Sequence, residues 1–159
     1  MRLVRILRYI EKVAATLLGH KSDSDYAAGV GRSGRGPQGG PRVEFTVERT
    51  EHTVVVVLKT DRLDANNAQI LKRAMESVLR DAKNVVIDLG SVRFMDSSGI
   101  GALLSCLRQV NAAGGQLRLC SVQEPVRQIM DLVRMHRVFT ICATREEAIE
   151  AGKQVSPTP

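Results

Sequence analysis

The chain has 159 residues and a net charge of +6, with 43% hydrophobic and 25% charged residues. This length fits one domain with a single core. Only three Phe, two Tyr and no Trp are present, which argues against a nucleic-acid binder that stacks bases on aromatic side chains. No apolar run reaches the roughly 18 to 20 residues that a membrane span needs, so no transmembrane segment is expected.

The positive charge is concentrated at the N-terminal end. Residues 1–42 contain eight basic and three acidic residues, whereas residues 43–159 contain fifteen and fourteen. The second part is therefore nearly neutral, which removes the electrostatic argument for a DNA-binding domain. We predict no nucleic-acid partner.

Residues 1–20 have the pattern of a basic amphipathic helix. The apolar side chains, among them Leu3, Ile6, Leu7 and Ile10, fall within an arc of about 140° when successive residues are placed 100° apart. The basic residues lie on the opposite side. Three roles fit such a helix: lying on an anionic membrane surface, docking into a groove of a partner protein, or folding back on its own domain.

Residues 21–42 are rich in Gly, Ser and Pro, and we predict a flexible linker. The spacing of Gly29, Gly31 and Gly34 matches the dinucleotide-binding fingerprint in form. That fingerprint works only between a strand and a helix, and no strand pattern precedes it here. A nucleotide site is therefore not expected.

From residue 43 onward, strand and helix patterns alternate. Strands are predicted at 43–47, 54–58, 85–89, 117–122 and 139–142, from alternating or continuous runs of largely β-branched residues. Helices are predicted at 64–80, 97–113, 125–133 and 144–151, from apolar residues at helical spacing with Pro125 and Thr144 as start signals.

The order β-β-α-β-α-β-α-β-α predicts an α/β fold. Its centre would be a mostly parallel sheet of four to five strands, joined by about four helices. We place this domain at residues 43–152 and a disordered tail at 153–159.

The three cysteines, Cys106, Cys120 and Cys142, are widely spaced and predict buried thiols rather than a disulfide framework or a zinc site. No metal or cofactor is expected.

The loop at residues 90–101 is the most informative one, because functional sites in parallel sheets gather after the C-terminal ends of strands. Asp96 is placed to cap a helix, and Ser97 would be its first residue. Gly99 and Gly101 cost roughly 1 kcal/mol each in helix propensity relative to Ala, so something must favour them. We expect these glycines to leave room for a close approach by another protein.

Four interpretations of this loop compete. It fits an ordinary capped helix. A serine hydrolase is disfavoured because Met95 occupies the first glycine position of the G-x-S-x-G turn. An anion site at the helix N-terminus lacks a P-loop lysine or a flanking basic cluster. Phosphorylation of Ser97 would add about −1.5 to −2 charges where the helix dipole tolerates them, and would obstruct a tightly packed interface.

The sequence Val85-Val-Ile-Asp-Leu-Gly-Ser-Val-Arg-Phe-Met-Asp-Ser-Ser-Gly-Ile-Gly-Ala-Leu-Leu resembles the signature of STAS domains, specifically of bacterial anti-sigma factor antagonists. The upstream Arg62-Leu63-Asp64-Ala65 is similar to the family's leader into its first helix. Residues 115–120, 126–132, 139–141 and 146–148 are also similar in order and spacing. The resemblance covers about residues 43–151 and implies a STAS-type fold.

The resemblance implies a regulatory protein and not an enzyme. Unphosphorylated antagonist binds an anti-sigma factor, which is a serine kinase, and thereby releases the sigma factor. The kinase phosphorylates the serine that follows the motif aspartate, here Ser97, and a serine phosphatase reverses the modification. The implied location is the cytoplasm. Residues 1–42 depart from the family pattern, and peripheral membrane contact through residues 1–18 is one reading of that departure.

The resemblance also implies a partner-binding surface. Asp96 would orient the kinase complex as well as cap the helix, and Ser98 would support the loop. Asp64 and Asn66 lie on the neighbouring loop, where a helix cap followed by a solvated turn is an equally good interpretation. The full set of expected partner-binding residues is Asp64, Asn66, Met95, Asp96, Ser97, Ser98, Gly99 and Ile100.

Two further functions remain open from the sequence. One is a non-switching STAS scaffold subunit of a membrane-associated ABC transport system, beside which the N-terminal helix would meet the membrane. The other is a small hydrolase, which lacks a credible base next to Ser97.

Overall fold

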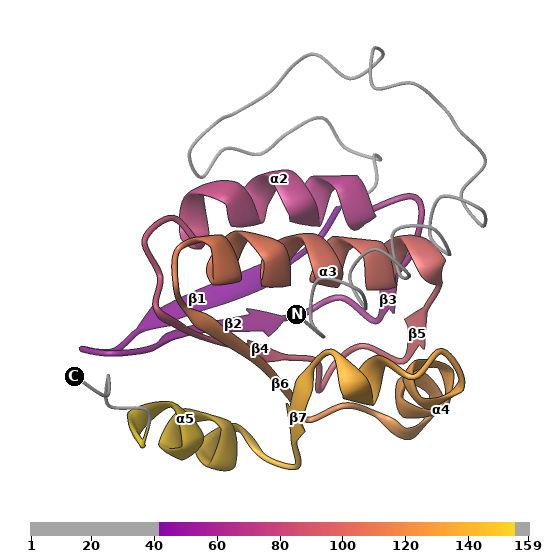
Figure 1. The fold of residues 1–159 in the computed structure, drawn as a ribbon. Coiled ribbons are helices and arrows are strands. Elements are labelled where there is room, and N and C mark those ends of the chain that lie inside the picture. Colours follow the sequence, from indigo (N-terminus) through magenta and orange to yellow (C-terminus); the bar gives the residue numbers. More distant parts are fainter. Residues whose placement is uncertain (1–41, 155–159) are drawn as a thin grey trace. The chain divides into compact units, whose positions relative to one another are not determined.

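The computed structural model describes residues 42–154, and five strands form its central sheet (Figure 1). The strands lie in the order β1-β2-β4-β6-β7. β1 pairs antiparallel with β2, and the other neighbours are parallel. The bounds are β1 (Phe45–Arg49), β2 (Val54–Leu58), β4 (Asn84–Asp88), β6 (Gln116–Cys120) and β7 (Thr140–Cys142). The prediction of an α/β fold around a mostly parallel sheet is confirmed.

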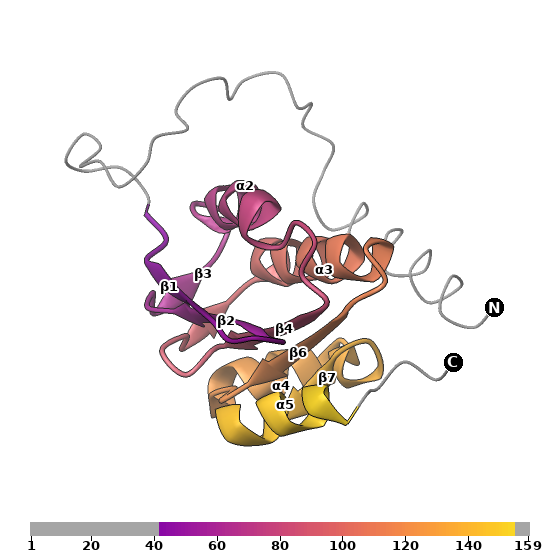
Figure 2. The ribbon, with the colours of Figure 1, turned by 90° about the vertical axis from the view of Figure 1, so that its left-hand side faces the viewer.

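Helices cover both faces of the sheet. Figure 2 shows α2 and α3 on one face and α4 and α5 on the other. Their bounds are α2 (Ala68–Val78), α3 (Ser97–Ala112), α4 (Glu124–Leu132) and α5 (Arg145–Lys153), and the 3-10 turn η1 (Met135–Arg137) precedes β7. Because both faces are covered, β2 and the middle of β4 are continuous apolar runs rather than alternating ones.

The hydrophobic core lies between the sheet and the helices on its two faces. In β2, four of the five residues are buried, and Val57 is half-buried. Val55 of β2 lies opposite Val86 of β4, and both belong to a buried cluster with Cys120 of β6 and Ala148 of α5. Fully burying a side chain of the size of Val or Leu stabilises the fold by about 1.5 to 3 kcal/mol. The three cysteines are free and buried, as predicted.

The edge of the sheet where β4 and β6 begin is occupied by cations at helix C-termini. Arg49 donates to the carbonyl of Val78 at 3.1 Å, and the buried Arg118 donates to the carbonyl of Ala151 at 3.2 Å. Lys83 donates to a carbonyl at the end of α3. A cation at this end complements the helix dipole. These basic residues therefore bind carbonyl groups near the C-terminal ends of helices, at the edge of the sheet opposite the Ser97 loop.

The predicted helix at 64–80 is shorter at both ends. Residues 64–67 form a turn, because the carbonyl of Asp64 accepts from the backbone N–H groups of Asn67 and Ala68 at 3.1 and 2.8 Å. At the other end a turn follows Val78, in which the backbone N–H of Ala82 donates to the carbonyl of Leu79 at 3.1 Å and Asp81 has φ of 63°, in the left-handed region. The helix therefore spans only α2.

The last helix is longer than predicted. It continues to Lys153, past Ala151 and past the expected domain end at 152. Lys153 pairs with Glu150 at 2.6 Å, and a lysine in the last turn complements the helix dipole.

The first strand is also shifted, from 43–47 to β1, because its register with β2 runs from Phe45 opposite Leu58 to Arg49 opposite Val54.

Several predictions concern residues outside the range that the structure describes. The helix at 1–20 with its apolar residues Leu3, Ile6, Leu7 and Ile10, the linker as far as residue 41, and the tail from residue 155 lie outside the described residues. Between residues 42 and 154, no helix has the length and apolar character needed to cross a membrane.

Candidate functional site

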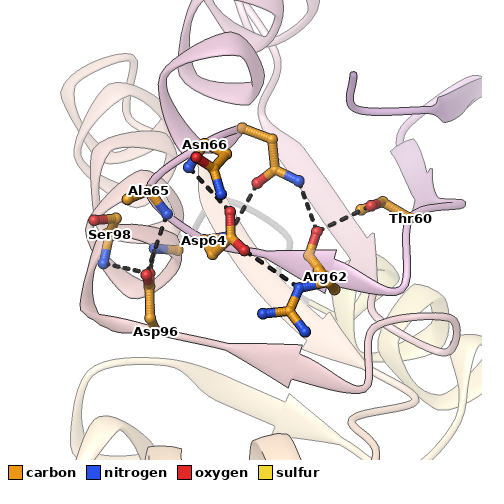
Figure 3. Close-up of polar contacts among 9 residues, drawn as sticks. Thr60, Arg62, Asp64, Ala65, Asn66, Asp96 and Ser98 are labelled. Carbon is orange, nitrogen blue, oxygen red and sulfur yellow. Dashed lines mark hydrogen bonds and ion pairs between the residues drawn. The ribbon is translucent and has the colours of Figure 1, made fainter. Parts of the chain in front are cut away.

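Two short strands that the sequence analysis did not predict build the site. β3 (Arg62–Leu63) and β5 (Phe94–Met95) pair in parallel, with Arg62 opposite Phe94 and Leu63 opposite Met95. The backbone N–H of Asp96 continues the pairing and donates to the carbonyl of Leu63 at 3.3 Å. The two loops that follow these strands therefore lie side by side, although about 30 residues separate them in the chain (Figure 3).

The Asp96 carboxylate joins the two loops. Its Oδ1 accepts from the backbone N–H groups of Ser98 and Gly99 at 2.8 and 3.1 Å, which caps α3. Its Oδ2 accepts from the backbone N–H of Ala65 at 3.1 Å (Figure 3). The predicted helix cap is confirmed, and the second bond adds a tertiary link that the sequence pattern did not indicate.

Ser97 is exposed and is the first residue of α3, directly after the cap. Ser98 is half-buried, and its backbone N–H is used by Asp96. An enzyme can therefore reach the side chain of Ser97 more readily than that of Ser98. The dipole at this helix end also favours a negative group there.

Gly99 is required by the protein's own backbone. A Cβ atom at this position would lie 2.3 Å from the carbonyl oxygen of Leu63 and 2.8 Å from Cγ of Met95, both closer than atoms can approach. A Cβ on Gly101 would meet nothing within 4 Å. The expectation that Gly99 leaves room for a partner is therefore wrong, because the strand β3 fills that space.

The Asp64 side chain is held within its own loop. Oδ1 accepts from the backbone N–H of Asn66 at 3.0 Å, and Oδ2 accepts from Nε of Arg62 at 3.3 Å. The hydrogen bond from Asn66, assisted by Arg62, lowers the pKa of the Asp64 carboxyl below its ordinary value. Asp64 does not cap α2, since the cap position is Asn67.

Asn67 is the site residue that the sequence analysis missed. Its Nδ2 donates to the carbonyl of Arg62 at 2.8 Å, and its Oδ1 accepts from the backbone N–H of Asp64 at 2.9 Å. The residue is 7% exposed, and its side chain fixes the path of the chain from β3 into the turn. The cluster of Asp and Asn at 64–67 is typical of such turns, but the bonded partners cannot be read from it.

The expected partner-binding residues divide into two groups. Asn66 and Ser97 are exposed, and Asp96 and Ser98 are half-buried at the same surface. The others are buried and shape the loops from within, namely Asp64, Met95, Gly99 and Ile100.

Known proteins similar to this chain include anti-sigma factor antagonists. A family model described as STAS domain matches residues 44–148. The anti-sigma F factor antagonist of Paenibacillus polymyxa is 26% identical over 117 residues, which are 72% of this chain and 100% of that protein. A solved structure of a putative anti-sigma factor antagonist from Thermotoga maritima is 25% identical, with a TM-score of 0.62 over 69% of this chain and 95% of that chain.

A second solved structure is that of the Bacillus cell fate determinant SpoIIAA in its phosphorylated form. It is 26% identical to this chain, with a TM-score of 0.53, and the match covers 68% of this chain and 98% of that one.

Proposed function

The chain belongs to the STAS domain family, and we propose that it is an anti-sigma factor antagonist switched off by phosphorylation of Ser97. In the unphosphorylated form it binds an anti-sigma factor that is a serine kinase, and the sigma factor is released. The kinase then modifies Ser97, and a serine phosphatase restores the binding form. This exchange takes place in the cytoplasm, and the protein acts in it as ligand and substrate.

The position of Ser97 is the observation that carries the proposal. It is exposed and follows the cap of α3 on a surface built by two joined loops. A phosphate there adds about −1.5 to −2 charges, which the helix N-terminus accommodates. The same group stands next to the Asp96 carboxylate, so a partner that packs closely on the unmodified loop must meet two neighbouring anionic groups after modification.

Among the similar proteins, SpoIIAA in its phosphorylated form supports the proposed modification, and the Paenibacillus polymyxa antagonist supports the proposed role. The residues buried beneath the Ser97 loop also support the proposed switch. Met95 is buried and Gly99 packs against the carbonyl of Leu63, so the loop that carries Ser97 is anchored to β3 before any phosphate is added.

Phosphorylation is tested by incubating the protein with ATP and a lysate of its source organism, followed by intact mass measurement and peptide mapping. We expect one phosphate, on Ser97, in the wild type and in Ser98→Ala, and none in Ser97→Ala. The responsible kinase is then fractionated, identified by this activity and purified. Absence of phosphate on Ser97, under conditions where a known antagonist is labelled, would contradict the proposal and favour a non-switching scaffold.

The effect of the charge is tested by calorimetry with the purified kinase. Ser97→Asp should bind it at least about tenfold more weakly than the wild type, whereas the control Ser97→Ala, which adds no charge, should bind within about threefold of the wild type. Equal binding by Ser97→Asp and the wild type would show that charge at this position does not control the partner.

A further inference from the structure

An arginine and an aromatic ring stand together on the surface beside Ser97. Arg62 of β3 lies opposite Phe94 of β5, and the guanidinium carbon of Arg62 is 4.1 Å from the centre of the Phe94 ring. The arginine side chain is 55% exposed and Phe94 is 39% exposed. Phe94 is one of few large apolar side chains exposed to this extent among the described residues.

The Arg62 side chain is held on two sides. The ring lies against the guanidinium plane, and Nε donates to Oδ2 of Asp64 at 3.3 Å. Figure 3 shows the other two nitrogens pointing away from Asp64. An arginine fixed in this way presents a planar pair of N–H donors with little rotamer freedom left to lose on binding. Such a group is suited to a carboxylate on a partner.

The pair lies close enough to Ser97 for one partner to cover both. Phe94 precedes Ser97 by three residues, so the two lie within roughly 10 Å of each other at about 3.3 Å per residue of extended chain. A standard interface covers about 800 Å² on each protein, which corresponds to a disc of roughly 16 Å radius. A kinase centred on Ser97 therefore covers Phe94 and its neighbour Arg62.

We propose that Arg62 and Phe94 form a recognition platform on which the kinase places a carboxylate beside an apolar side chain. The inference rests on the proposed function, since the occupant is the kinase that modifies Ser97. Arg and aromatic residues are the types that carry most of the binding energy in interfaces, especially when they are held rigid near the centre. The platform supplies affinity, and Ser97 supplies the switch.

Calorimetry of the unphosphorylated protein with the purified kinase tests the platform. Phe94→Ala and Arg62→Ala should each weaken binding about tenfold or more. Arg62→Met keeps an unbranched side chain on the ring and removes the N–H donors, so it should also bind weakly and lose part of the salt dependence. Arg80→Ala changes an exposed arginine at the opposite edge of the sheet and should leave binding unchanged.

Two results would overturn the inference, and they differ from each other. If the wild type binds the kinase, Ser97→Asp does not, and the variants at positions 62 and 94 bind within twofold of the wild type, the platform alone is wrong. This holds even if those variants lower the melting temperature, because the pair would then only join β3 to β5. If the wild type itself does not bind the kinase, the proposed function fails and the platform fails with it.

Discussion

The two oxygens of the Asp96 carboxylate act on different elements. One caps α3, and the other accepts from the backbone of Ala65 in the loop after β3. The cap follows from local spacing, since a helix start leaves its first N–H groups without partners. The bond to Ala65 depends on a contact between residues 31 positions apart. A single residue thus serves both the helix and the surface around Ser97.

The glycines of α3 provide the first residue-scale prediction. Gly99→Ala should destabilise the protein by about 2 kcal/mol or more, because its Cβ cannot fit beside the carbonyl of Leu63. Gly101→Ala is the matched control in the same helix. It should be stabilising by up to about 1 kcal/mol, since nothing lies within 4 Å and alanine favours the helix. Urea unfolding followed by circular dichroism measures both changes, and equal effects would contradict the packing at Gly99.

The lowered pKa of Asp64 provides a pH prediction. A carboxyl whose pKa is lower in the folded state contributes stability above its ordinary value of 3.8, and this contribution is lost as the pH falls below it. Asp64→Asn removes the titrating group. Between pH 5 and pH 3 its free energy of unfolding should therefore fall less than that of the wild type. Parallel curves for the two proteins would indicate that the bonds from Asn66 and Arg62 do not favour the charged form.

At the scale of elements, the pairing of β3 with β5 is what creates the site. Each strand has two residues, and their register brings the Asp64–Asn67 turn against the start of α3. The main sheet alone would leave these loops as separate connections. The small sheet thus converts two loops into one surface, on which Ser97 is exposed and Gly99 is covered.

A variant of Asn67 tests whether its side chain holds the turn at residues 64–67. Asn67→Ala leaves the carbonyl of Arg62 and the backbone N–H of Asp64 without their partner, and should cost about 2 kcal/mol. The matched control is the exposed neighbour, Asn66→Ala, which should cost about 0.5 kcal/mol or less. Urea unfolding gives the stabilities, and hydrogen exchange at Asp64 should be faster only in the first variant. Equal stability of the two variants would show that the buried amide does not hold the turn.

At the scale of the whole molecule, helices on both faces of the sheet exclude water from the central strands. The three thiols report on this exclusion. Burial raises the pKa of Cys106 to about 12 and that of Cys120 to about 11, and it also raises the pKa of Cys142. A thiol must lose its proton to react, so the folded protein contains very little reactive thiolate near neutral pH.

The corresponding prediction is that none of the three cysteines reacts with Ellman's reagent at pH 8 while the protein is folded. All three should react rapidly in urea, which is the control for reagent and protein concentration. Reaction of one thiol in the folded protein, at the rate seen in urea, would mean that one side of the sheet opens locally without global unfolding.

The sequence by itself determined the sheet, the helices that cover it, and the cap at Asp96. Each of these features leaves a local pattern in the chain: the apolar run Val54–Leu58 indicates a strand buried on both sides, and the order Asp-Ser-Ser-Gly indicates a helix start. The resemblance of residues 85–104 to STAS domains pointed to the family from the same local pattern.

Only the tertiary structure decided how the site is assembled. A strand of two residues, such as β3 or β5, is too short to show a period, so its pairing leaves no trace in the sequence pattern. That pairing determines that Gly99 faces Leu63 and that Arg62 rests on Phe94. Each of these contacts joins two segments that are about 30 residues apart in the chain. Their energies depend on three-dimensional proximity, which local propensity does not contain.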